Sequence, residues 1–132
     1  MVEVLIVDDS SFARRALAAM LEKDPEINVA GVAANGEQAV ELARKLDPDV
    51  ITLDVEMPRM NGLTALKIIM AENPCPVIMV SSLTNEGAET TLKAMDLGAL
   101  DFMPKFSSGG RLDMQALEKE LRFKVKALAR LN

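Results

Sequence analysis

Five short apolar runs alternate along the chain with stretches in which apolar residues recur every three or four positions. Short apolar runs predict buried strands, and the three-to-four spacing predicts amphipathic helices. Strands that alternate with helices form repeated units around a parallel sheet. The order of elements therefore predicts an α/β fold with a five-stranded, doubly wound parallel sheet. The predicted strands are Val4 to Val7, Val29 to Ala33, Val50 to Leu53, Val77 to Val80 and Leu100 to Met103.

Four helices are predicted between these strands, and a fifth follows the last strand. Asp113 is placed to cap the fifth helix, with Leu112 and Leu117 at the positions of a hydrophobic staple. Its apolar stripe, expected to pack on the sheet, is Met114, Leu117, Leu121, Val125 and Leu128. The predicted helices are Ser10 to Lys23, Gly36 to Leu46, Asn61 to Glu72, Asn85 to Leu97, and Asp113 to the chain end.

A length of 132 residues is that of one domain, so residues 1–132 are expected to share a single core. A net charge of -5 argues against a nucleic-acid-binding surface, which needs clustered cations. The small basic groups Arg14-Arg15 and Lys124, Lys126 and Arg130 are interpreted as solvated helix surface. No apolar run approaches the ~20 residues of a membrane span, and the start has no basic leader. A cytoplasmic protein without a membrane or nucleic-acid partner is expected.

The chain has no histidine and a single cysteine, Cys75. The lack of histidine removes Ser-His-Asp and Cys-His catalysis and every imidazole metal site. A lone cysteine cannot form an internal disulfide, and Cys75 is interpreted as a small, partly buried side chain. Carboxylates, hydroxyls and lysines are left to carry any chemistry.

Such residues follow four of the five predicted strands. Asp8 and Asp9 follow the first strand, Asp54 ends the third, Ser81 ends the fourth and Lys105 follows the fifth. In parallel sheets ligands bind beyond the carboxyl ends of the strands, where the strand order reverses. These side chains are therefore expected to converge at one edge of the sheet.

The expected cluster suits magnesium and a phosphoryl group. Oxygen ligands favour a hard cation such as Mg²⁺, and a carboxylate can act as a nucleophile that forms an aspartyl phosphate. In this hypothesis Asp8 and Asp9 hold the metal, and Asp54 attacks the phosphorus. Lys105 and Ser81 then contact the phosphoryl oxygens.

Each residue taken alone also has a structural interpretation. An aspartate after a strand is usually a helix cap or a turn residue, which could explain Asp8 or Asp9 singly. Two adjacent aspartates exceed what one cap requires. Asp54 at the rim of a buried sheet costs free energy unless it is paired or metal-bound. The joint placement favours the functional interpretation.

At these residues the sequence resembles a response-regulator receiver domain along essentially its whole length. The segments that carry the resemblance are VLIVDDS from Val4, DVITLDVEMPRMNG from Asp49, PVIMVSS from Pro76 and LGALDFMPK from Leu97. The resemblance implies the strand order 2-1-3-4-5 and phosphorylation by a sensor histidine kinase. It further implies that Asp8, Asp9, Asp54 and the backbone carbonyl of Glu56 bind Mg²⁺, that Asp54 accepts phosphate, and that Ser81 and Lys105 contact it.

The resemblance also implies that Phe102 is an aromatic switch residue, which turns inward when Ser81 moves toward the phosphate. The alternative for Phe102 is a plain core phenylalanine. One departure from the family concerns Lys105, which receivers usually follow with proline, often through a cis bond. Here Phe106 follows, and a cis bond before a non-proline residue costs roughly 2.5–4 kcal/mol.

Within the receivers, the segments from Val77 to Thr84, Gly87 to Thr91 and Gly98 to Phe102 resemble the regulatory half of chemotaxis protein-glutamate methylesterases. In that family the receiver precedes a hydrolase domain and covers its active site until phosphorylation. The chain is thus expected to be either an excised regulatory domain, with the methylesterase domain as its partner in cis, or a free-standing receiver acting on another output partner. By itself it is expected not to hydrolyse a glutamyl methyl ester.

Two other functions fit the same fold class. A flavodoxin-like cofactor binder needs a phosphate loop after the first strand and aromatics for the flavin, whereas this chain has Asp8-Asp9 there and no Trp or Tyr. A hydrolytic aspartyl-phosphate phosphatase needs an additional acid to activate water, and Glu56 is the only nearby candidate.

Overall fold

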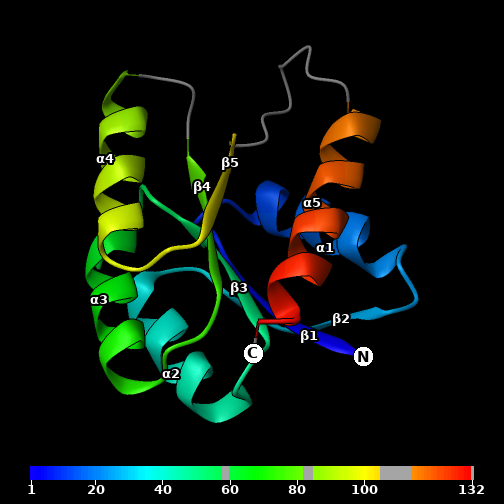
Figure 1. Cartoon of the computed structure of the whole chain (residues 1–132), viewed down its shortest axis with the longest axis horizontal. Coiled ribbons are helices and arrows are strands. Elements are labelled where there is room, and N and C mark those ends of the chain that lie inside the picture. Colours follow the sequence, from blue (N-terminus) through cyan, green and yellow to red (C-terminus); the bar gives the residue numbers. More distant parts are fainter. Residues whose placement is uncertain (58–59, 82–84, 105–113, 132) are drawn as a thin grey trace.

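A computed structural model of the chain describes residues 1–57, 60–81, 85–104 and 114–131. A parallel sheet in the order β2-β1-β3-β4-β5 lies at the centre, with helices on both of its faces (Figure 1). This confirms the predicted α/β class and strand order. The elements are β1 (Val2–Val7), α1 (Ser11–Glu22), β2 (Ile27–Ala33), α2 (Gly36–Leu46), β3 (Val50–Asp54), α3 (Gly62–Glu72), β4 (Val77–Ser81), α4 (Asn85–Asp96), β5 (Asp101–Pro104) and α5 (Met114–Ala129).

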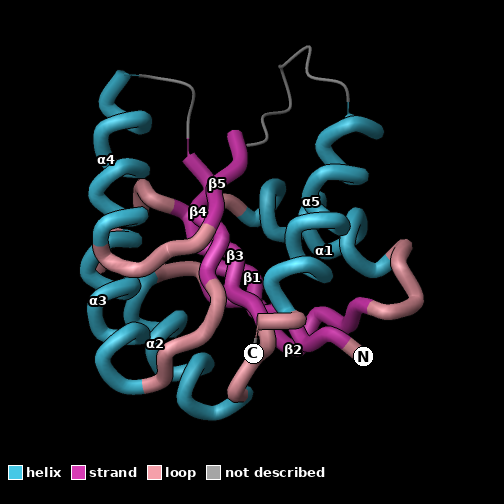
Figure 2. The backbone as a smooth tube through the Cα atoms, viewed as in Figure 1, coloured by secondary structure: helices cyan, strands magenta, loops and turns pink. Residues whose placement is uncertain are grey.

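The two faces of the sheet carry different helices and separate apolar cores. Helices α2, α3 and α4 cover one face, and α1 and α5 cover the other (Figure 2). Since successive side chains of a strand point to opposite faces, each central strand contributes to both cores. In β4, for example, Val77 and Met79 pack toward α2–α4, whereas Ile78 packs toward α1 and α5.

The helix stripes predicted from the sequence pack on these cores. Leu17 and Leu21 of α1, and Leu121 and Val125 of α5, are buried in one cluster. Burying a side chain of this size contributes roughly 1.5–3 kcal/mol. The side chain of Met114, the first member of the α5 stripe, lies outside what the structure describes.

Several predicted boundaries differ from the structure by one to three residues. β1 and β2 each begin two residues early, because the Val2 N–H donates to the Glu26 carbonyl at 2.7 Å and extends their pairing. α1 begins at Ser11, since Ser10 is its cap, and α5 ends at Ala129 instead of the chain end. The predicted cap and staple residues Asp113 and Leu112 lie outside the described residues.

The interpretation of the lysines of α5 as solvated surface is wrong for two of them. Lys124 Nζ lies 3.1 Å from Asp101 Oδ1, and Lys126 Nζ lies 2.8 Å from Asp24 Oδ2. These ion pairs fasten α5 to β5 on one side and to the turn before β2 on the other. No helix in the described part of the chain is long and apolar enough to cross a membrane.

Candidate functional site

Three aspartates meet at the carboxyl edge of the sheet, as the sequence predicts. Asp8 and Asp9 follow β1, Asp54 ends the adjacent strand β3, and one carboxylate oxygen of each lies within 4.8 Å of the others. Asp8 and Asp54 are each only 1% exposed, whereas Asp9 is exposed. The cluster therefore consists of two buried carboxylates and one carboxylate that faces solvent.

Backbone amides orient both buried carboxylates. The N–H of Ser10 donates to Asp8 Oδ1 at 2.9 Å, and the N–H of Glu56 donates to Asp54 Oδ1 at 3.1 Å. Ser10, whose Oγ accepts from the Ala13 N–H, caps α1. The helix-cap interpretation of Asp8 and Asp9 is therefore wrong. The turn interpretation holds for Asp8, because its carboxylate accepts a hydrogen bond from the Ser10 N–H. A carboxylate has about four acceptor positions, so this bond orients the group without using all of them.

Gly62 lets α3 approach the end of β3. A Cβ at Gly62 would lie 2.3 Å from the Asp54 carbonyl oxygen and 2.9 Å from Val55 Cα. The Gly62 N–H donates to the Val55 carbonyl at 3.1 Å, and the neighbouring Asn61 caps the helix. The sequence indicates only a turn at Asn61-Gly62, because the steric contact depends on where α3 packs.

Arg14 is a second residue of the site that sequence reasoning missed. The sequence predicts solvated helix surface for it, but its Nη1 donates to the Asp8 carbonyl oxygen at 2.7 Å. The Arg14 side chain thereby links α1 to the loop that presents the aspartates. The only sequence signal is its place in the first turn of the helix that follows them.

The geometry of the cluster fits a magnesium ion. Two oxygens bound directly to one Mg²⁺ are at most about 4.2 Å apart, which is twice the bond length of ~2.1 Å. A spread of up to 4.8 Å thus accommodates two direct carboxylate ligands and a third within reach of a bound water. Mg²⁺ commonly keeps several waters and uses one or two carboxylates.

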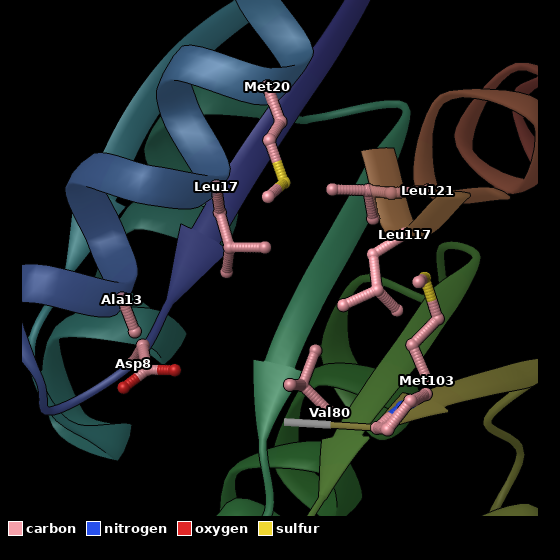
Figure 3. A pocket seen from close by; sticks show the side chains of 9 residues that line it. Asp8, Ala13, Leu17, Met20, Val80, Met103, Leu117 and Leu121 are labelled. Carbon is pink, nitrogen blue, oxygen red and sulfur yellow. The ribbon is translucent and has the colours of Figure 1, made fainter. Parts of the chain in front are cut away.

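The surroundings of the cluster differ on its two sides. Toward α1 and α5, Asp8 borders a small apolar cavity of about 20 Å³, lined by Ala13, Leu17, Val80 and Leu117 among others (Figure 3). Toward α3 and α4, Asp9 and Glu56 line a groove that is open to solvent. Among the three aspartates, Asp9 is therefore the one that borders this groove.

The remaining predicted site residues are Ser81, which is buried, Phe102, which is exposed, and Lys105. Ser81 is 7% exposed and ends β4, one residue beyond Val80, which pairs with Asp54 in the sheet. Its Oγ lies 2.8 Å from Thr91 Oγ1 of α4. Phe102 is 51% exposed, so the core alternative for it is wrong, and Lys124 Nζ lies 5.7 Å from its ring centroid. Lys105 and the Lys105–Phe106 bond lie outside the described residues.

This sheet order, with three aspartates at its carboxyl edge, is the arrangement that the resemblance to receiver domains predicts. Residues 4–117 match the family described as response regulator receiver domain. The chain belongs to the response-regulator receiver family.

Within that family the chain is similar to chemotaxis methylesterases. It is 62% identical over 130 residues to protein-glutamate methylesterase/protein-glutamine glutaminase 1 of Oleidesulfovibrio alaskensis, and 52% identical over 130 residues to the corresponding protein of Pyrococcus abyssi. In each case the match covers 98% of this chain and 35% of the relative. The chain thus spans about a third of the length of these curated relatives.

The chain is also similar to solved structures. The response regulator domain of Thermotoga maritima CheB superposes with a TM-score of 0.89 at 44% identity, covering 100% of this chain and 98% of that one. A chain of the CheX-CheY-BeF3-Mg+2 complex from Borrelia burgdorferi superposes with a TM-score of 0.74 at 30% identity, covering 93% of this chain and 88% of that one.

Proposed function

We propose that this chain accepts a phosphoryl group on Asp54 from a sensor histidine kinase, in the presence of Mg²⁺. The observation that carries the proposal is the cluster of Asp8, Asp9 and Asp54 at the carboxyl edge of the sheet, where Asp9 also lines a groove open to solvent. The similarity to a chain from a complex with beryllofluoride and magnesium, a phosphoryl mimic and its metal, supports it.

Asp8, Asp9, Asp54 and the backbone carbonyl of Glu56 would hold the metal. When bound, Mg²⁺ neutralises negative charge on the oxygens of the phosphoryl group. The three carboxylates are also negatively charged, and without a counter-ion they would repel both one another and an incoming phosphate. Metal and phosphoryl group are therefore expected to bind together better than the phosphoryl group alone.

Asp54 is the nucleophile in this proposal. One of its carboxylate oxygens forms a bond to phosphorus, while the bond between phosphorus and the donor nitrogen breaks. The imidazole leaving group keeps the electron pair and takes up a proton, and Asp54 becomes an acyl phosphate. The Glu56 N–H holds the carboxylate in one orientation, which reduces the entropic cost of the attack. Ser81 and Lys105 are proposed to bond the oxygens of the transferred group.

The output of the switch is proposed to be the surface formed by α4, β5 and α5. Leu92 of α4, Phe102 of β5 and Phe123 of α5 expose large apolar side chains on these elements. In the proposal Phe102 turns inward when Ser81 moves toward the phosphate, and the surface changes shape. The partner that reads it would be a methylesterase domain in the same polypeptide, as the names of the relatives suggest, or a separate protein. The chain alone, having no histidine, would not hydrolyse a glutamyl methyl ester.

Intact-mass spectrometry tests the acceptor. Incubation with acetyl phosphate and Mg²⁺ should add the mass of one phosphoryl group, and chelation of the metal should prevent the addition. Asp54→Asn should remain unlabelled, while the exposed control Glu89→Gln should label as the wild type does. Equal labelling of Asp54→Asn and wild type would contradict the assignment of Asp54.

Amide chemical shifts test the switch. Beryllofluoride with Mg²⁺ should change the shifts of residues around Phe102 in β5 as well as those near Asp9 and Asp54. Changes confined to the loops after Asp9, Asp54 and Ser81 would refute the role of Phe102 and leave a phosphate site without a readout.

A further inference from the structure

The hydroxyl of Ser81 is held by Thr91, a buried threonine of α4. The two Oγ atoms lie 2.8 Å apart, and Thr91 is only 6% exposed. Thr91 Oγ1 also lies 2.8 Å from the carbonyl oxygen of Gly87, one turn earlier in the helix. Thr91 therefore joins the end of β4 to the first turn of α4.

The number of available protons determines which hydroxyl donates in each of these two hydrogen bonds. A hydroxyl has one proton to donate, and the Gly87 carbonyl can only accept. When both bonds are made, the Thr91 proton goes to Gly87 and the Ser81 proton goes to Thr91. The single proton of Ser81 is then committed to α4 and cannot be donated to a phosphoryl oxygen.

The sheet places Ser81 and Asp54 on opposite faces. Met79 packs in the core toward α2–α4, and Val80 borders the cavity between α1 and α5, so alternation puts Ser81 on the α4 side. Asp54 follows Leu53, which also packs toward α2–α4, and therefore points to the α1 and α5 side. Ser81 must leave Thr91 before it can bond a group carried by Asp54.

We propose that Thr91 is a positioning residue that holds Ser81 in the unphosphorylated arrangement and opposes its bond to the phosphoryl group. This inference rests on the proposed function, since it concerns the same phosphoacceptor site. Thr91 belongs to the helix whose exposed side contributes to the proposed output surface. Release of Ser81 breaks this link between α4 and the end of β4, so Thr91 couples the phosphoryl site to that surface.

Thr91→Val isolates this contact because valine keeps the shape of threonine and removes its hydroxyl. The Thr91–Gly87 bond lies within α4 and is lost from both arrangements alike, so only the bond to Ser81 differs between them. A neutral hydrogen bond lost from the unphosphorylated arrangement corresponds to about fivefold tighter binding of a phosphoryl mimic, with a range of roughly two- to tenfold.

The probe is beryllofluoride, titrated in the presence of Mg²⁺ into the 132-residue chain and followed by calorimetry. Thr90→Val is the matched control, because Thr90 Oγ1 donates to the Glu86 carbonyl at 2.9 Å in the same helical pattern. Thr91→Ser restores the hydroxyl and should return the affinity to that of the wild type. In a Ser81→Ala background, Thr91→Val should change nothing. Melting curves establish that each variant folds, and Thr91→Ala replaces Thr91→Val if the latter does not.

The outcomes separate the two proposals. Tighter binding in Thr91→Val, rescue by serine and no effect without Ser81 would support the positioning role. Unchanged or weaker binding in Thr91→Val, or the same gain in the Ser81→Ala background, would overturn it. A wild-type chain that binds no beryllofluoride with Mg²⁺ would instead overturn the phosphoacceptor function itself.

Discussion

Removing one negative charge from the aspartate cluster should stabilise the metal-free protein. In Asp54→Asn the side chain keeps its shape and its oxygen can still accept from the Glu56 N–H, so the main change is the loss of charge. At the outer limit of 4.8 Å between the carboxylate oxygens, two unit charges repel by about 3.5 kcal/mol at an effective dielectric constant of about 20. The Arg14 guanidinium on the Asp8 carbonyl oxygen and the exposure of Asp9 reduce this repulsion, and we expect a net gain of roughly 1–3 kcal/mol.

For a chain of this length such a gain raises the melting temperature by roughly 4–12 °C. The assay is thermal unfolding followed by circular dichroism at low ionic strength, with and without Mg²⁺. Asp9→Asn should give a smaller rise, because exposed charges are screened. Added Mg²⁺ should stabilise the wild type and narrow its difference from Asp54→Asn, since a ligand of the native state raises stability by mass action.

The control for this prediction is Glu89→Gln, which removes an exposed charge on α4 away from the cluster. Its melting temperature should stay close to that of the wild type. If Asp54→Asn melted at or below the wild-type temperature without Mg²⁺, the aspartates would not be under mutual repulsion. If Mg²⁺ raised the melting temperatures of Asp54→Asn and of the wild type equally, Asp54 would not share a metal site with Asp8 and Asp9.

Three further predictions concern other parts of the molecule. Gly62→Ala should destabilise the chain by roughly 1–3 kcal/mol in urea unfolding, because its Cβ would meet the Asp54 carbonyl at 2.3 Å, and an unchanged midpoint would contradict this. The hydrogen bond from Lys126 lowers the pKa of Asp24, so this pair stabilises the fold above about pH 4 and is lost as pH falls through the lowered pKa. Lys126→Met should therefore lose stability at pH 7 but little at pH 2, and a loss independent of pH would refute the ion pair. Burial raises the pKa of Cys75 to about 12, so a thiol reagent at pH 8 should label native protein far more slowly than unfolded protein.

The part of the site that sequence could predict is the part that follows from strand ends. Asp8, Asp9 and Asp54 lie where short apolar runs stop, and parallel strands end at a common edge, so their convergence needs no tertiary detail. Ser81 also ends a strand at this edge, but its side chain lies on the opposite face of the sheet from Asp54 and contacts Thr91. The strand order does not follow from the strand ends. It is predicted only by the resemblance to a family, because the alternation of strands and helices does not determine which strands are neighbours.

The residues that sequence missed depend on how helices pack. Arg14 reaches the Asp8 carbonyl only because α1 folds back beside β1, and Thr91 meets Ser81 only because α4 lies over the end of β4. The ion pair of Lys124 is not predictable for the same reason, since its partner Asp101 is distant in sequence and adjacent only where α5 packs beside β5. A charged or hydroxyl side chain on a helix carries no local signal of such a partner.

The most direct test of the account is to locate the phosphoryl group chemically. Reduction of the phosphorylated chain with borohydride converts an aspartyl phosphate to homoserine, which tandem mass spectrometry can assign to one position. The account predicts homoserine at position 54 after treatment with acetyl phosphate and Mg²⁺, and none when the metal is chelated. Homoserine at position 8 or 9, or labelling that survives in Asp54→Asn, would contradict it.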